Sequence, residues 1–223
     1  MRKHQIFMEG QDITDIVVES ALNFGINKEF IDRLSTMILI QIYIAYNSRT
    51  DNVFHITNEI LKLEGLSPRG RSHTKKATMF NRKPYLRGLW HKHYLGSNIA
   101  DMAINLKAAL NNYGLPKLNE KINELSSKGI LKDFLPEDAG RIAHEVVIDN
   151  YFKRSQDSKL TGHWIIYAVH EGKNHYLTLA RHTDDEAKIR EKIEEICAIE
   201  FPFLKEILHP INAVKTDPSK LEK

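Results

Sequence analysis

The sequence predicts an α+β protein that is mostly helical, with a C-terminal antiparallel β-hairpin or small sheet packed on helices. Two changes of pattern along the 223 residues support this prediction. Apolar residues recur at helical spacing in six segments before residue 157, and the pattern then alternates in GHWIIYAVH and HYLTLARH, which EGKN separates. A last helical pattern, TDDEAKIREKIEEICAIEF, follows the predicted hairpin.

Three helices are expected in the N-terminal part. The segment DITDIVVESALNFG has one apolar face, made of Ile13, Ile16, Val17, Ala21 and Phe24. The segment KEFIDRLSTMILIQIYIAYN predicts a longer, mostly buried helix, and FHITNEILKLEG predicts a short one that ends at Gly65. The most apolar run, residues 37–46, is too short to span a bilayer, so no membrane partner is expected.

A basic window follows, from Gly65 to Ala100. It contains eight basic and no acidic residues: Arg69, Arg71, Lys75, Lys76, Arg82, Lys83, Arg87 and Lys92. Because the whole chain carries +3, the remainder carries −5. Glycines and Pro84 interrupt the window, which predicts a long loop with at most short strands. Such a segment in a mildly acidic body indicates a nucleic-acid partner, RNA more than DNA, with Trp90 available for base stacking.

Three further helices are predicted between the window and the hairpin, and one after it. SNIADMAINLKAALNNYG is expected to begin at Ser97, with a stripe of Ile99, Met102, Leu106, Ala109 and Leu110. KLNEKINELSSKG and PEDAGRIAHEVVIDNYFKRS follow it. The last helix has Thr183 and Glu186 at capping-box spacing, and its expected core face is Ile189, Ile193, Ile196 and Cys197.

These elements suggest one compact domain overall, with an N-terminal helical part (1–64), the basic loop segment (65–96) and a C-terminal part (97–223). The only cysteine, Cys197, excludes an intramolecular disulfide. With no secretory pattern at the start of the sequence, this favours a cytoplasmic setting.

The hairpin gives the most specific functional prediction. A two-residue turn at Gly172-Lys173 would pair His163 with His182, Ile165 with Ala180, Tyr167 with Thr178 and Val169 with Tyr176. One face would then present two histidines, two tyrosines and a threonine. The other face would be core: Trp164, Ile166, Ala168, Leu177 and Leu179.

Two opposed histidines suit general acid–base catalysis, because the ordinary pKa of histidine lies near 6.5. The sequence therefore predicts a metal-independent ribonuclease that needs no cofactor, in a bacterial toxin or phage-defence setting. His163 and His182 would act as acid and base, while Tyr167 and Thr178 would orient the phosphate or ribose. His91, Lys92 and His93, in the stretch WHKHY, would stabilise charge on the phosphate.

Three alternatives remain open. The basic window alone would suit a non-catalytic nucleic-acid-binding protein, such as an antitoxin, a repressor or a mobile-element accessory factor. The histidines would also suit a metal site. The acidic C-terminal helix would suit a protein partner. HEVVID resembles H-E-x-x-H but has Ile148 at the second histidine position, and the sequence has no P-loop or G-x-S-x-G motif.

Overall fold

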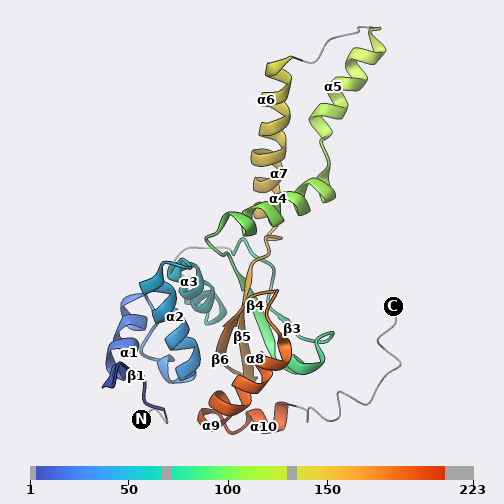
Figure 1. Cartoon of the computed structure of the whole chain (residues 1–223). Coiled ribbons are helices and arrows are strands. Elements are labelled where there is room, and N and C mark those ends of the chain that lie inside the picture. The colour runs from blue at the N-terminus through green and yellow to red at the C-terminus, as the bar shows by residue number, and fades with distance from the viewer. Residues whose placement is uncertain (1–3, 67–71, 130–134, 209–223) are drawn as a thin grey trace. The chain divides into compact units, whose positions relative to one another are not determined.

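The computed structural model describes residues 4–66, 72–129 and 135–208 (Figure 1). The chain has the expected α+β fold, and helices predominate. It divides into two compact units. Unit 1 comprises Met1–Ser72, Lys76–Ser97 and Gly162–Lys223, and unit 2 comprises His73–Lys75 and Asn98–Thr161. The candidate site lies wholly in unit 1.

A four-stranded antiparallel sheet forms the centre of unit 1. Its order is β3 (Thr78–Met79), β4 (Trp90–Tyr94), β5 (His163–His170) and β6 (Lys173–Ala180). The sheet is therefore not confined to the C-terminal part, because β3 and β4 come from the basic window. The stretch WHKHY is an interior strand and not part of a loop. A separate two-stranded ribbon is formed by β1 (Phe7–Met8) and β2 (Gln11–Asp12).

One face of the sheet packs against three N-terminal helices, α1 (Thr14–Asn23), α2 (Thr36–Ser48) and α3 (Val53–Leu63) (Figure 1). The long helix expected over this region is broken. A short 3₁₀ turn, η1 (Ile31–Arg33), is followed by Leu34, which forms a bridge with Tyr176 of β6. The Ser35 side chain then accepts the Ile38 N–H and caps α2.

The opposite face packs against one element of the basic window and four C-terminal elements. These are η2 (Pro84–Leu86), α8 (Glu186–Lys192), η4 (Ile193–Cys197), α9 (Ala198–Glu200) and α10 (Leu204–Ile207). Ile189, Ile193 and Cys197 are buried there as expected. The helix begins two residues later than predicted, because Asp185, and not Thr183, caps it by accepting the Ala187 N–H.

The expected hairpin register was wrong. The turn residues are Glu171 and Gly172, both at positive φ, and His170 pairs with Lys173. Tyr167 pairs with Tyr176, but Ile166 pairs with Thr178, so Leu177 is an extra residue in β6. This β-bulge reverses which face the later residues of β6 occupy. Both faces of the hairpin are buried, in contrast to the single core face that the sequence suggested.

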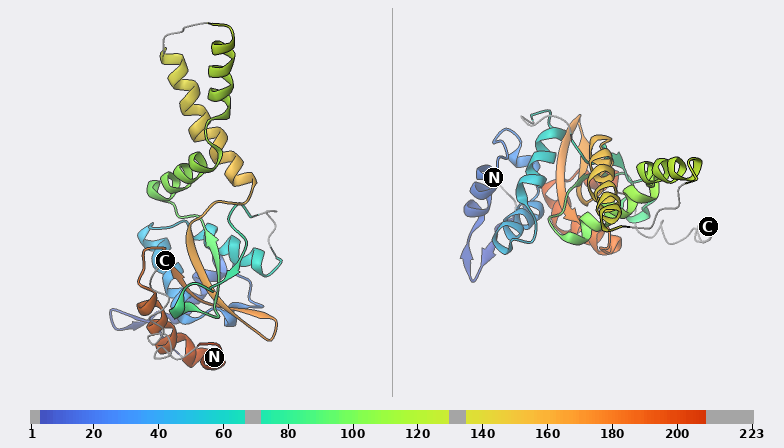
Figure 2. Two further views of the ribbon diagram at one scale, coloured as in Figure 1. Left: turned by 90° about the vertical axis from the view of Figure 1, so that its right-hand side faces the viewer. Right: turned by 90° about the horizontal axis from the view of Figure 1, so that it is seen from above.

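Unit 2 is helical, with α4 (Ile99–Tyr113), α5 (Pro116–Ser127), α6 (Pro136–His144), η3 (Glu145–Asp149) and α7 (Asn150–Gln156). Helices α5 and α6 run side by side (Figures 1 and 2). The buried carboxylate of Glu145 accepts the N–H groups of Lys117 and Leu118 at the start of α5. None of the described helices is long and apolar enough to cross a bilayer.

The first helix of unit 2 differs from its prediction in two respects. Asn98, and not Ser97, provides the cap, because its side chain accepts the Asp101 N–H. Of the expected apolar stripe only Ala109 is buried, whereas Ile99 is 79% exposed. The buried position beside Ala109 is polar: Asn105 bonds to the backbone of Thr161. Unit 2 is therefore organised by polar contacts that helical periodicity does not reveal.

Candidate active site

Three histidines gather on the face of the sheet that carries Trp164. His91 and His93 alternate along β4 and therefore point to the same side, and His93 lies opposite Trp164 of β5. The ring centroids of His91 and His93 are 5.4 Å apart. The ring of His91 stacks on that of Phe80 at 4.3 Å. We call His91, His93 and His182, together with Trp164 and Phe80, the imidazole cluster.

His182 joins this cluster from the loop after β6. Its ring centroid lies 5.2 Å from that of His93, with the planes 22° apart, and 4.3 Å from the Trp164 ring. His182 is exposed, His91 is half-buried, and His93 is only 5% exposed. The buried His93 ring thus lies between two imidazoles that solvent can reach.

The backbone of Gly162 fixes the orientation of His93. The Nδ1 atom lies 2.9 Å from the Gly162 carbonyl oxygen and 3.3 Å from its nitrogen. The shorter contact requires a proton on Nδ1, and a neutral ring then has its acceptor at Nε2. No larger residue fits at position 162, because a Cβ there would lie 2.0 Å from the Tyr94 carbonyl oxygen. The close approach of β4 to Gly162 therefore positions the His93 imidazole.

A cation lies beside the cluster. The Lys83 ammonium group is 5.8 Å from the centre of the Trp164 ring and forms an ion pair with Glu186. Lys76, Arg82 and Arg87 are also in unit 1 and are exposed. Lys75 belongs to unit 2, where its N–H donates to the Leu160 carbonyl. Two other residues of the basic window, Arg69 and Arg71, lie outside the described residues.

His163 does not face His182, so the expected pairing of these two side chains was wrong. It lies opposite Tyr94 in the β4–β5 pair, on the face that packs against α1–α3, and its ring contacts the Tyr94 ring at 5.6 Å. The bulge at Leu177 is the physical reason, because it moves His182 to the opposite face. Only one histidine of the hairpin region therefore joins the imidazole cluster.

Tyr167 lies on the opposite face of the sheet from the cluster, whereas Thr178 shares the face of Ile166 but has its hydroxyl group bonded elsewhere. Tyr167 is buried between Trp90 and Tyr176, and burial raises its pKa to about 12. Thr178 is buried and donates to the Gln41 side chain or the Leu179 carbonyl. Trp90, expected to stack on a base, is half-buried and packs against the N-terminal core. None of these three side chains presents a polar group to the cluster.

Lys92 points to the opposite face from His91 and His93. Its ammonium group is 3.0 Å from a carboxylate oxygen of Glu59 and donates to the Ser72 hydroxyl. Burial lowers the pKa of Lys92 below its ordinary value, although the Glu59 charge opposes this change. Lys62 also pairs with Glu59. The position of Lys92 thus indicates a structural ion pair that links β4 to α3.

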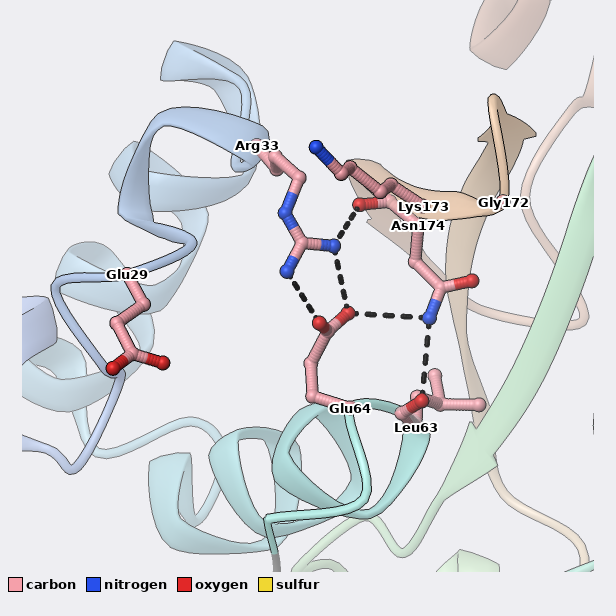
Figure 3. Close-up of a pocket in the computed structure, with 7 residues that line it drawn as sticks. All are labelled: Glu29, Arg33, Leu63, Glu64, Gly172, Lys173 and Asn174. Carbon is pink, nitrogen blue, oxygen red and sulfur yellow. Dashed lines mark hydrogen bonds and ion pairs between the residues drawn. The ribbon is translucent and has the colours of Figure 1, made fainter.

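A second polar network, which the sequence did not suggest, lies at the hairpin turn (Figure 3). Arg33 pairs with Glu64 and donates to the Asn174 carbonyl oxygen, while the Asn174 side chain donates to Glu64 and to the Leu63 carbonyl. The Tyr176 hydroxyl group also donates to the Glu64 carboxylate. A cavity of about 440 Å³ lies over this network. Because each of these polar groups already has a partner, the network anchors the hairpin to η1 and α3.

Within the described residues, no group of three or more His, Cys, Asp or Glu side chains has an arrangement that would hold a metal ion. The HEVVID segment lies in unit 2, where His144 is on the surface and approaches Asp149 at 3.7 Å. Cys197 is buried, and burial raises its pKa to about 12, which opposes a role as a nucleophile.

Comparison of the chain with protein-family models, with curated proteins and with solved structures gave no match. The chemistry of the site therefore has to be argued from its own geometry.

Proposed function

We propose that unit 1 is a metal-independent ribonuclease whose acid and base are in the imidazole cluster. The observation that carries this proposal is the contact of His182 with His93 at 5.2 Å, next to His91 and the Lys83 ammonium group. Several imidazoles that exchange protons near neutral pH, beside a cation, are what RNA phosphodiester cleavage requires.

His182 is assigned to proton exchange with the substrate because it is exposed, and His91 because it is half-buried, with its Nε2 atom 3.3 Å from the hydroxyl group of the exposed Thr78. One imidazole accepts the proton of the ribose 2′-OH, whose oxygen attacks phosphorus. The bond from phosphorus to the 5′ oxygen breaks, and the other imidazole protonates that oxygen. The products are a 2′,3′-cyclic phosphate and a free 5′-OH. His93 is a positioning residue, held by Gly162 and packed between the other two rings.

The exposed cations of the basic window support an RNA substrate. Lys76, Arg82 and Arg87 belong to the same unit as the cluster and would attract a phosphate backbone. Cleavage through the 2′-OH excludes DNA as a substrate. The proposal keeps the cytoplasmic toxin or phage-defence setting as its biological context, with a protein partner at the acidic C-terminal helix.

The test is cleavage of a labelled RNA oligonucleotide in EDTA. His182→Ala should reduce cleavage by about 10²-fold or more, because positioned acid–base groups contribute about 10²–10⁴-fold. His182 is exposed, so the variant should fold normally. His144→Ala, on the surface of unit 2, is the matched control and should retain full activity. Full activity of His182→Ala, or cleavage of an all-deoxy oligonucleotide, would show that the proposal is wrong.

A non-catalytic RNA-binding protein is the second candidate, favoured by the exposed Arg82 and Arg87. It predicts salt-sensitive binding without turnover, weakened by neutralising these two arginines and unaffected by His182→Ala. Binding without any cleavage product in EDTA would select this candidate. Recovery of cleavage by added Zn²⁺ or Mn²⁺ would instead favour a histidine-bound metal.

A further inference from the structure

The indole N–H of Trp164 has no hydrogen-bond partner among the described residues, although Trp164 is only 4% exposed. A buried donor left unsatisfied is unusual in a folded protein and raises the free energy of the state that contains it. The Trp164 ring is packed against three other aromatic rings. Phe80, His91 and His182 contact it through their rings, at centroid distances of 5.3, 5.7 and 4.3 Å.

Lys83 supplies a positive charge at the same place. Its ammonium group lies over the Trp164 ring and is paired with Glu186 at the start of α8. The Lys83 side chain is 41% exposed and that of Glu186 is 19% exposed, so solvent reaches this ion pair. A partly exposed pair of this kind is held weakly, and another anion can compete with the carboxylate.

We propose that Trp164 and Lys83 form an oxyanion-binding subsite that takes a phosphate oxygen. The ligand would accept a hydrogen bond from the indole N–H and pair with the Lys83 ammonium group in place of Glu186. A phosphate group offers both an acceptor oxygen and a negative charge. Because the indole nitrogen is buried in this state, the exposed His182 ring, which lies 4.3 Å from the Trp164 ring, would move aside to admit the oxyanion.

This inference rests on the proposed function in assigning the phosphate to an RNA backbone, since the subsite adjoins His182. It adds two residues to the site. Trp164 was expected only as a core residue, and Lys83 only as one cation among several. In this proposal Glu186 is an internal competitor, because its carboxylate pairs with Lys83 when no ligand is bound.

The experiment uses the indole N–H resonances of the full chain in ¹⁵N-labelled protein. The protein has two tryptophans, so Trp90→Phe leaves Trp164 as the single indole signal. Inorganic phosphate and a non-cleavable deoxy-dinucleotide are titrated at constant ionic strength, with chloride as the reference anion. A saturable downfield shift of the Trp164 N–H with phosphate or the dinucleotide, and none with chloride, is expected. The two ligands distinguish a free phosphate from a backbone phosphodiester.

Three variants test the assignment. Lys83→Met should weaken binding at least about tenfold, because it removes the charge-assisted contact. Glu186→Gln should tighten binding about two- to fivefold, because it removes a competitor worth no more than a typical exposed pair. Lys188→Met, which removes an exposed cation from the same helix, should change nothing. The dispersion of the amide spectrum shows whether each variant is folded.

A Trp164 signal that does not shift in the folded protein, or that shifts equally with chloride, would overturn the subsite. Unchanged binding in folded Lys83→Met would do the same. These results are separable from the cleavage assay. A loss of cleavage in His182→Ala without any Trp164 response refutes the subsite alone, whereas a Trp164 response without cleavage keeps the subsite and refutes the ribonuclease.

Discussion

His93 and His182 stack ring against ring at 5.2 Å, although β5 separates β4, which carries His93, from β6, which precedes His182. The two rings meet across Trp164, which contacts His182 at 4.3 Å and lies opposite His93 in the strand pair. The Trp164 ring therefore lies beside two imidazoles, those of His93 and His182, that are far apart in the sequence.

The first prediction concerns the positioning role of His93. In His93→Asn the side-chain amide can replace Nδ1 at the Gly162 carbonyl, whereas the second ring nitrogen is lost. We expect a folded protein in which RNA cleavage falls and the pH dependence of the rate changes, because the partner of the His182 ring is no longer an imidazole. Rates measured from about pH 5 to 8 test this. An unaltered pH profile would remove His93 from the site.

The second prediction concerns the buried pair of Lys92 and Glu59. Glu59→Gln leaves a buried ammonium group without its carboxylate and should cost about 3–5 kcal/mol of unfolding free energy. The double variant Glu59→Gln/Lys92→Met should recover part of this loss. Denaturant unfolding of both single variants and the double variant gives the coupling energy, and additive effects within about 0.5 kcal/mol would contradict the pairing.

The same Lys92→Met variant separates structure from catalysis. Because Lys92 points away from the imidazole cluster, the folded fraction of this variant should cleave RNA at the wild-type rate. A loss of cleavage without a loss of stability would instead restore Lys92 to the catalytic role that the sequence suggested.

The third prediction concerns Arg33 and Glu64 at the hairpin turn. Burial would raise the pKa of Glu64, but hydrogen bonds from Arg33, Tyr176 and Asn174, with the Arg33 charge, lower it below 4.5. A carboxyl whose pKa is lower in the folded state stabilises the fold above its unfolded pKa, and this stabilisation is lost as the pH falls through the folded pKa.

Arg33→Met should therefore cost about 2–3 kcal/mol at pH 7, and less at an acidic pH below the folded pKa of Glu64, where the carboxyl group is protonated in both proteins. Urea unfolding at the two pH values measures the difference. Lys128→Met, which removes an exposed ion pair with Glu124, is the matched control and should have little effect. An Arg33→Met penalty that is the same at both pH values would contradict this account.

The fourth prediction concerns the turn of the hairpin. Glu171 has φ of 49° and Gly172 has φ of 72°, as a type I′ turn requires, and glutamate tolerates this conformation poorly. Glu171→Asn should raise the unfolding free energy by about 0.5–1 kcal/mol without altering RNA binding. Lys173→Asn, two residues later at the start of β6, is the control and should give no gain. Equal effects of the two variants would exclude the backbone explanation.

The fold class and most of the helices could be predicted from the sequence, because apolar residues at helical spacing indicate which side of a helix is buried. Val17, Ala21, Ile193 and Cys197 lie in the core for this reason. Periodicity failed in unit 2, where Asn105 is buried and Ile99 is exposed, because the side of α4 that is buried is held by the hydrogen bonds of Asn105 and does not coincide with the apolar stripe.

The proximity of two of the three imidazoles in the cluster could also be predicted from the sequence. His91 and His93 alternate, so a strand places them together, and both were singled out. The contact of these histidines with His182, and the position of His163 on the other face, depend on the register between β5 and β6. No short-range sequence pattern specifies that register. Lys92 was misjudged because its partner Glu59 lies in α3, a contact visible only in the folded chain.

The bulge in β6 has a consequence for how this protein can vary. Leu177 is one residue inserted between two stretches that each pair regularly with β5, and its carbonyl accepts the Ser35 hydroxyl. If β6 continued at the register of the turn, Leu177 would pair with Ile166, the residues beyond it would exchange faces, and His182 would lie on the same face as His163. A one-residue shift in the pairing of β6 with β5 would thus separate His182 from His91 and His93 without changing any side chain. In this fold, the register in which β6 pairs with β5 determines which side chains form the candidate site as much as the identity of those side chains does.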